Sequence, residues 1–374
     1  MPRLVSPALQ AEGRRDSRGA ECAVGLIAHS AARLTVVQNR PDCFDTSHCL
    51  RRAPMRHPLL ATLALVFSTF VGAQGYPSKP IRWIVPSTPG DGSDITGRLI
   101  AEKISQELGQ SVVIDNKPGA GGVLGSEIAA RAPADGYTMI VGNAGSHGIN
   151  AAIYSKLPYD VLKDFVPVAL LCTAPNVMVV GPATKVKTVA EFVAYAKGQA
   201  GKINYASGGV GSSSHLSAEL LKSMAGVEMT HVPYKGAAPA VAAVMADEVN
   251  VMIGNLPPLL PQIRAGRVQA LAVTTARRHT SLPDVPTLAE SGLPGYSAYV
   301  WMGLLAPKGT PPEVVKKLHD AFKKAMEEPS YVAALGRYDM LPNYMSSADY
   351  TRFAQETSVR EKVLIEKLGL AKGQ

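Results

Sequence analysis

Two segments of the sequence place glycines and hydroxyl side chains directly before an apolar helical pattern. Residues 87–93 read Ser-Thr-Pro-Gly-Asp-Gly-Ser, and residues 207–214 read Ser-Gly-Gly-Val-Gly-Ser-Ser-Ser. The free backbone N–H groups at a helix start carry about half a positive charge, so they bind anions without Arg or Lys. Glycine lets the backbone approach a ligand closely, and hydroxyls add donors. The pair favours binding of a small anion, although each loop alone is also typical of an ordinary strand-to-helix turn.

The expected ligand contacts come mainly from these two loops. The set comprises Ser87, Thr88, Gly90, Asp91 and Ser93 in the first loop, Gly211, Ser212 and Ser213 in the second, and Asn143 at the end of a predicted strand. Tyr234 and Trp301 offer two interpretations: their rings either form an apolar wall of the ligand site or belong to the core.

A third glycine-rich loop, residues 119–125, resembles a dinucleotide-binding fingerprint with irregular spacing. A true fingerprint follows the first strand and has an acidic residue about twenty positions later, at the end of the next strand. Here the loop follows the second predicted strand, and Asp135 falls in a turn. We favour a tight structural turn, with nucleotide binding as the alternative.

Residue patterns for catalysis or metal binding are sparse. His147, His215 and His231 lie far apart and lack the spacing of metal ligands. Asp91 and Asp94 either pair as an acid and a base or serve to cap a helix and shape a turn. We therefore predict no catalytic residue, no bound metal and no cofactor.

The elements that would position these residues alternate between strands and helices. Short apolar runs predict strands at 81–85, 111–115, 137–142, 177–180, 203–206, 249–254 and 269–274. Helical patterns begin near Ser93, which we expect to be a cap, and near residues 122, 188, 213, 311 and 347. The alternation predicts a parallel sheet covered on both faces, in two halves of similar size. A crevice between such halves is where open α/β sheets bind ligands.

The N-terminal region differs from the rest of the chain. Residues 1–54 hold eight Arg, no Lys and three of the four cysteines, without a sustained apolar period. Residues 55–73 give a charged start, an apolar run and a small-x-small ending, the layout of a secretory signal peptide. We expect residues 1–54 to be a misassigned, disordered extension and translation to begin at Met55. An Arg-rich targeting peptide and an uncleaved membrane anchor are the alternatives.

Cleavage after Ala73 would leave 301 residues, enough for two modest lobes. The formal charge would fall from +8 to about +4, since residues 1–54 contribute +3 and Arg56 +1. The sequence has no cluster of Lys and Arg of the kind that would predict nucleic-acid binding. A mildly basic protein suits an anionic ligand. Only Cys172 would remain, in an apolar stretch typical of a buried residue, so no internal disulfide is expected.

Seven motifs, in order from Tyr76 almost to the C terminus, resemble those of the Bug family, the receptors of tripartite tricarboxylate transporters. They are Tyr76-Pro-Ser-Lys-Pro-Ile, Asp94 with Arg98, Asn116-Lys-Pro-Gly-Ala-Gly-Gly, Asp135-Gly-Tyr-Thr, Tyr205-Ala-Ser-Gly-Gly-Val-Gly-Ser-Ser, His231-Val-Pro-Tyr-Lys-Gly and Leu282-Pro-Asp-Val-Pro-Thr-Leu-Ala-Glu. The resemblance implies an α/β type II periplasmic-binding-protein fold, with two lobes around a central cleft. It also implies capture of a small organic carboxylate in the periplasm, a pair of membrane subunits as partner, and no chemistry. Asn255 follows from the resemblance as a further ligand-side residue.

We expect a monomer in which residues 74–173 and 298–374 form lobe I and residues 174–297 form lobe II. Closure of the lobes would use crossings near 171–176 and 296–300. Two other functions stay open: a ligand-loaded sensor that docks on a membrane signalling partner, and a nucleotide-dependent enzyme that uses the loop at 119–125.

One position departs from the family pattern. Family members usually carry a Gly-Gly pair where this chain has Gly90 and Asp91. A carboxylate there would repel a ligand carboxylate, accept a hydrogen bond from a ligand amine or hydroxyl, or point outward. We hypothesise that Asp91 narrows specificity away from simple dicarboxylates.

Overall fold

The structure is a computed structural model that describes residues 75–371. The expected extension at 1–54 and the signal peptide at 55–73 lie outside the described residues. Within the described part, no helix combines the length and the apolar character that crossing a membrane requires.

The first sheet is built on three parallel strands and is extended by antiparallel ones. Strand β1 (Ile81–Val85) lies between β2 (Val112–Asn116) and β3 (Thr138–Asn143), and both pairings are parallel. Strand β9 (Tyr299–Pro307) then pairs antiparallel with β3 and with β4 (Phe165–Val180), and β10 (Leu341–Met345) pairs antiparallel with β4.

The second sheet repeats the arrangement. Strand β5 (Asn204–Ser207) lies between β6 (Thr230–Pro233) and β7 (Val251–Asn255), again in parallel. The end of β4 pairs antiparallel with β7 and with β8 (Gln269–Val273). The expected parallel pairing is therefore correct for β1–β3 and for β5–β7, whereas β9 runs antiparallel to β3 in the first sheet and β4 runs antiparallel to β7 in the second.

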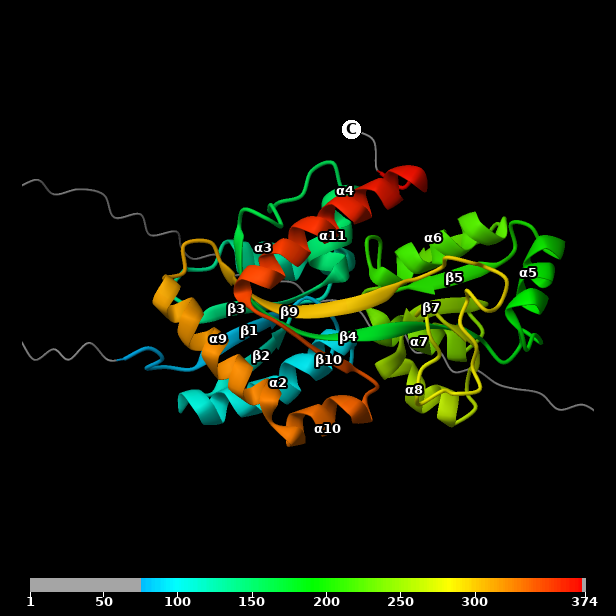
Figure 1. The fold of residues 1–374 in the computed structure, drawn as a ribbon. Helices are drawn as coiled ribbons and strands as arrows, with labels where there is room; N and C mark the ends of the chain where they lie inside the picture. The colour runs from blue at the N-terminus through cyan, green and yellow to red at the C-terminus, as the bar shows by residue number, and fades with distance from the viewer. Residues whose placement is uncertain (1–74, 372–374) are drawn as a thin grey trace, which may run out of the picture. The chain divides into compact units, whose positions relative to one another are not determined.

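Strands β4 and β9 connect the two sheets. They pair from Phe165 opposite Pro307 to Pro175 opposite Tyr299, and from Asn176 onward β4 pairs with β7 instead. Figure 1 shows the two strands side by side, running from the elements around β1 to those around β5. This is the predicted two-lobed α/β fold. The predicted crossing at 171–176 lies on β4, and the one at 296–300 includes the first residues of β9. The lobe boundaries themselves stay a prediction.

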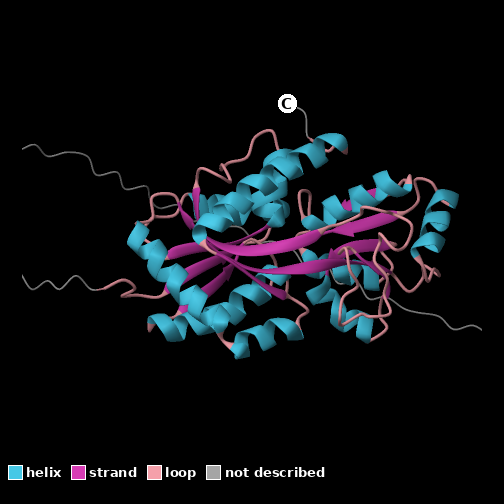
Figure 2. Cartoon of the chain, in the orientation of Figure 1, coloured by secondary structure: helices cyan, strands magenta, loops and turns pink. Residues whose placement is uncertain are grey.

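Helices cover the strands on both sides, as Figure 2 shows. They are α2 (Gly92–Leu108), α3 (Val123–Ala130), α4 (Asn150–Ile153), α5 (Val189–Gly198), α6 (Ser213–Ala225), α7 (Ala237–Met245), α8 (Leu256–Arg264), α9 (Pro312–Glu327), α10 (Pro329–Arg337) and α11 (Ser347–Lys367), with short turns η2 (Ala120–Gly122) and η3 (Gly145–Ile149). The predicted cap of the first helix was wrong. Asp91, with extended backbone, accepts the Gly92 N–H at 2.7 Å and caps α2, so Ser93 lies inside the first turn.

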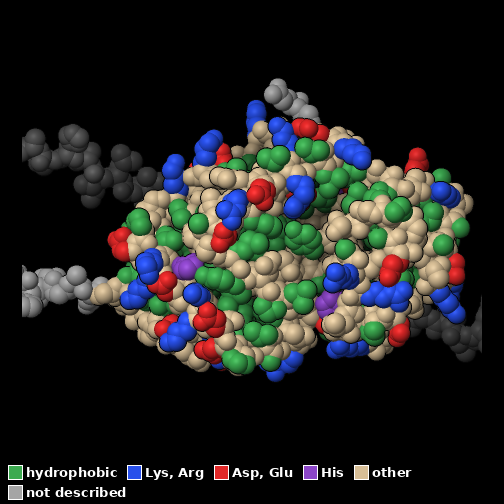
Figure 3. All heavy atoms as spheres, viewed as in Figure 1, with side chains coloured by type: hydrophobic (Ala, Val, Ile, Leu, Met, Phe, Trp, Pro, Cys, Tyr) green, Lys and Arg blue, Asp and Glu red, His purple; other side chains and the backbone are tan. Residues whose placement is uncertain are grey.

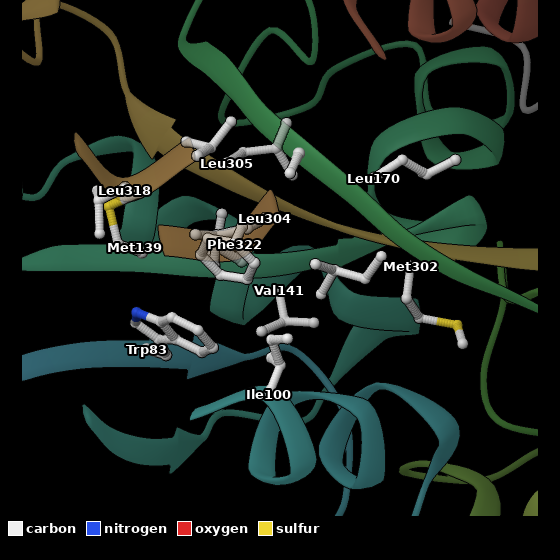
Figure 4. Close-up of a cluster of buried hydrophobic side chains, with 14 of the residues drawn as sticks. Trp83, Ile100, Met139, Val141, Leu170, Met302, Leu304, Leu305, Leu318 and Phe322 are labelled. Atoms are coloured by element: carbon white, nitrogen blue, oxygen red, sulfur yellow. The ribbon is translucent and has the colours of Figure 1, made fainter. Parts of the chain in front are cut away.

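The core of the first lobe lies between α2, the sheet and α9. Trp83 stacks on Phe322 with ring centroids 5.3 Å apart, and both side chains are fully buried. Ile100, Val141 and Leu304 surround the pair (Figure 4). The helix predicted to begin near residue 311 is α9, and its apolar residues, spaced with a 3.6-residue period, pack inward. Cys172 is also buried, as predicted, and burial raises the pKa of its thiol to about 12.

Phe322→Ala should lower the free energy of unfolding by about 3–5 kcal/mol, because it removes a stacked ring from a closed core. Urea denaturation followed by tryptophan fluorescence measures this loss. Val363→Ala on α11 is the control, since Val363 is 62% exposed and its loss should cost under about 0.5 kcal/mol. Equal losses in the two variants would contradict this description of the core.

Candidate functional site

Loops from both lobes enclose a polar cavity at the carboxyl ends of the parallel strands. Its volume is about 50 Å³, above the ~10–15 Å³ that one water needs. The lining residues are Pro86, Ser87, Asp91, Pro118, Gly119, Gly121, Gly122, Asn143, Gly208, Ser212, Ser213, Ser214, Gly236, Ala237, Met252, Asn255 and Val300. The cavity thus has room for more than a single water, and most of its donors are amides and hydroxyls.

Asp91 forms part of the wall contributed by the first lobe. Its Oδ1 accepts the Gly92 N–H at 2.7 Å and the Asn255 Nδ2–H at 3.0 Å. The second bond joins the two lobes, because Asn255 ends β7. Burial raises the pKa of the Asp91 carboxyl, although these hydrogen bonds oppose the shift. The hydroxyl of Ser87, 6% exposed, lies on the same wall, close enough to Asp91 to lower the pKa of its carboxyl as well.

Asp94 lies three residues further along and has a different role. Its carboxylate accepts the Gly90 N–H at 2.9 Å, the Asn116 Nδ2–H at 2.9 Å and the Arg98 guanidinium at 3.0 Å. Burial alone would raise the pKa of Asp94, but these hydrogen bonds outweigh burial and lower it. Asp91 therefore caps α2, while Asp94 fixes the loop before the helix. This is the predicted alternative in which the two residues cap a helix and shape a turn.

The second lobe contributes the start of α6. Ser212 caps this helix, because its Oγ accepts the His215 N–H at 3.3 Å and donates to the Gly209 carbonyl at 2.7 Å. The amides of Ser213 and Ser214 have no acceptor within the helix. No acidic residue stands in the first turn of α6, whereas Asp91 and Asp94 stand at the start of α2. The two helix starts therefore differ: α6 can accept an anion, and α2 already holds one of its own.

Glycines allow the two lobes to touch around the cavity. Gly121 adopts φ 63°, and a Cβ there would lie 2.1 Å from the Val210 carbonyl oxygen of the other lobe. A Cβ at Gly236 would lie 2.4 Å from Cγ2 of Thr88. Within the first lobe, Asn150 Nδ2 donates to the Gly121 carbonyl at 3.1 Å. The lobes are in contact in this structure, and a side chain at either glycine would separate them.

The expected ligand contacts divide into two groups. Ser87, Asp91, Asn143, Ser212, Ser213 and Asn255 line the cavity, whereas Thr88, Gly90, Ser93, Gly211, Tyr234 and Trp301 do not. Ser93 acts behind the wall, because its Oγ accepts the Asn143 Nδ2–H at 3.0 Å. Trp301 is 1% exposed and packs edge-on against Tyr350. Of the two interpretations of this ring, the one that places it in the core is therefore correct.

Several cavity residues did not follow from local patterns. The glycines of the 119–125 loop were interpreted as a tight turn, yet Gly121 and Gly122 line the cavity as well. Their positive φ angles confirm the turn, and only the opposite lobe explains the close approach. Met252 and Val300 form an apolar side of the cavity that no sequence signal indicates.

Cationic side chains are absent from the described lining of the cavity, which holds no Lys, Arg or His. Among residues 75–371, no group of three or more His, Cys, Asp or Glu could hold a metal ion.

His215 and His231 stack with ring centroids 4.2 Å apart, and Ser207 hydrogen-bonds His231 at 2.6 Å. His147 packs against Phe165, and burial lowers its pKa to about 3. On the face shown in Figure 3, acidic and basic side chains are interspersed.

Comparisons with known proteins agree with this geometry. The family model described as tripartite tricarboxylate transporter family receptor matches residues 96–370. Protein BugT of Bordetella pertussis is 35% identical over 79% of this chain and 92% of its own length. An R. palustris protein solved with adipate is 37% identical, with a TM-score of 0.77 over 79% of this chain and 99% of that chain. MatC from Rhodopseudomonas palustris, with bound malate, is 34% identical, with a TM-score of 0.75 over 78% and 100%.

Asp91→Asn should stabilise the protein more at neutral pH than at acidic pH. The pKa of Asp91 is higher in the folded state than in the unfolded state. The stabilisation of the folded wild type that results is fully present below the ordinary aspartate pKa and is lost as the pH rises through the folded pKa. Asparagine still caps α2 but has no charge to bury. Urea denaturation of both proteins at pH 3.5 and pH 7 measures the change. A stability difference that is equal at the two pH values would contradict the buried carboxylate.

Proposed function

This chain belongs to the tripartite tricarboxylate transporter receptor family, and from that membership we propose that it captures a small organic carboxylate for uptake. In this proposal the receptor binds the acid between its lobes and delivers it to the membrane subunits of a tripartite transporter. The receptor changes no covalent bond of the acid.

One observation carries the proposal. The start of α6 opens into a cavity that both lobes enclose, with free amides at Ser213 and Ser214 and no acidic residue in its first turn. Such a helix start binds a carboxylate through its amides and its partial positive charge. The related proteins solved with adipate and malate support the same ligand class.

Binding would be coupled to closure of the lobes. A ligand in this cavity touches both lobes, so it binds the closed state better than the open state and shifts the population toward closure. The Asp91–Asn255 hydrogen bond and the contact of Gly121 with Val210 form only when the lobes meet. Strands β4 and β9 are the connections that would bend, at the crossings near 171–176 and 296–300.

The site of action follows from the same family relationship. We propose that residues 55–73 direct export and that the mature receptor works as a monomer in the periplasm. A solved structure described as a periplasmic transporter, 39% identical to this chain with a TM-score of 0.77, supports the location.

Native mass spectrometry of the purified protein is the direct test of carboxylate capture. We expect a co-purified acid of small mass, and calorimetry with that acid should give a dissociation constant of about 1 µM or tighter, near −8 kcal/mol. The acid should be recovered unchanged after prolonged incubation. Conversion of the acid to a product, or no affinity for any organic acid, would contradict the proposal.

Gly121→Ala should weaken binding of the co-purified acid at least tenfold, because the new Cβ would meet the Val210 carbonyl and hold the lobes apart. Gly109→Ala is a matched control: Gly109 has φ 64°, close to the 63° of Gly121, but nothing lies within 4 Å of its added Cβ. Both variants carry about 1–2 kcal/mol of backbone strain, so only the contact differs.

Small-angle scattering then separates closure from simple loss of stability. The radius of gyration should fall when the acid is added to wild type and to Gly109→Ala, and should change less for Gly121→Ala. Tight binding by Gly121→Ala, with the same compaction as wild type, would show that the contact does not belong to the closed state.

A further inference from the structure

Asp91 already occupies the position at which α2 would bind an anion. Its Oδ1 takes the Gly92 N–H at 2.7 Å, so the first amide of the helix is used by the chain's own carboxylate. Asp94 in the same first turn is paired with the Arg98 guanidinium, so the uncompensated charge at this helix start belongs to Asp91. A ligand carboxylate is therefore repelled from the start of α2 and attracted to the start of α6.

Charge balance limits what the rest of the ligand can be. Asp91 is 8% exposed, and no Lys, Arg or His among the described residues lines the cavity to offset its charge. A simple dicarboxylate would bring two more negative charges into this space, beside a charge that is already poorly solvated. A ligand with a positive charge next to Asp91 would balance it.

Asn255 shows how far apart the two binding positions lie. Its Nδ2–H donates to Asp91 Oδ1 at 3.0 Å, and its Oδ1 accepts from the Ser213 hydroxyl at 3.3 Å. One side-chain amide therefore connects the Asp91 wall to the start of α6. A ligand that reaches both positions needs its two charged groups only a few bonds apart, as in an α- or β-amino acid.

We propose that the ligand is an amino-carboxylate whose carboxylate binds the amides at the start of α6 and whose ammonium group binds the carboxylate of Asp91. The inference rests on the proposed carboxylate capture and names the ligand class for that site. The Ser87 hydroxyl, buried on the same wall beside Asp91, is an additional group for the ammonium end.

A hydroxyl in place of the ammonium would fit the space but not the charge. A neutral O–H donor leaves the Asp91 charge buried without a counter-charge, whereas an ammonium forms a charge-assisted bond. Burial raises the pKa of Asp91 in the absence of such a partner, which agrees with a carboxylate that lacks its counter-ion. An uncharged, protonated Asp91 that donates to a ligand carboxylate is the competing arrangement, and the experiment distinguishes it.

Succinate, malate and aspartate form the probe series, because they share one carbon chain and differ in a hydrogen, a hydroxyl and an ammonium group. Alanine and propionate form a second pair without the second carboxylate. For wild type, calorimetry should show at least tenfold tighter binding of the ammonium compound in at least one of two comparisons. The comparisons are aspartate against succinate or malate, and alanine against propionate. The acid recovered by mass spectrometry should contain an amino group.

Asp91→Asn tests the residue itself, since asparagine keeps the helix cap and removes the charge. In this variant the ratio of affinities, ammonium compound over nitrogen-free analogue, should fall to about one or below. Glu102→Gln removes one negative charge from an exposed position on the same helix, about 15 Å along α2, and should leave the preference unchanged. Circular dichroism confirms that the variants fold.

The outcomes separate the two proposals. If the recovered acid is nitrogen-free, or wild type binds succinate as tightly as aspartate and Asp91→Asn changes nothing, the amino-carboxylate assignment fails while carboxylate capture stands. Proton uptake on succinate binding, seen as buffer-dependent heats, would assign the protonated Asp91 arrangement instead and overturn the assignment. Absence of binding to every acid would overturn carboxylate capture as well.

Discussion

The pairing of β4 with β9 is the constraint on which the rest of the structure depends. Strand β4 pairs with strands of both sheets, and it pairs antiparallel with β9 from Phe165 opposite Pro307 to Pro175 opposite Tyr299. The parallel strands of each lobe attach to this pair, so the loops at their carboxyl ends face one another across the cavity. Every polar group of the cavity is placed relative to these two strands, which also form the connection that lobe closure would bend.

Closure of the cavity then depends on the absence of side chains at a few positions. The backbone of Gly121 approaches the backbone of Val210, and the backbone of Gly236 approaches the side chain of Thr88. The contact buries Asp91 without a cationic neighbour, which is why the pKa values of Asp91 and Asp94 shift in opposite directions. Arg98 and Asn116 bind Asp94 outside the cavity, whereas Asp91 accepts a side-chain hydrogen bond from Asn255 of the other lobe. The glycine contacts and the unusual electrostatics of the site are thus two aspects of one closed geometry.

Local sequence patterns predicted those parts that local physics determines. The strands at 81–85 and 269–273 and the helix at 213–225 match their predicted ranges closely, because apolar runs and a serine cap encode them within a few residues. Strand β4 was predicted only for its end, because Pro167 and Pro175 interrupt the pattern and its partner β9 lies far along the chain. The position of Ser212 and Ser213 in the cavity lining was predictable, because these residues begin a helix. The role of Gly121 was not, because it depends on Val210 in the other lobe.

A crystal structure of the protein with its co-purified acid would test carboxylate binding at the start of α6. We expect a ligand carboxylate within about 2.8–3.0 Å of the Ser213 and Ser214 amides, with the lobes in contact at Gly121. The acid's other polar group should face Asp91. A carboxylate held at the start of α2, or an acid bound away from this cavity, would contradict the account.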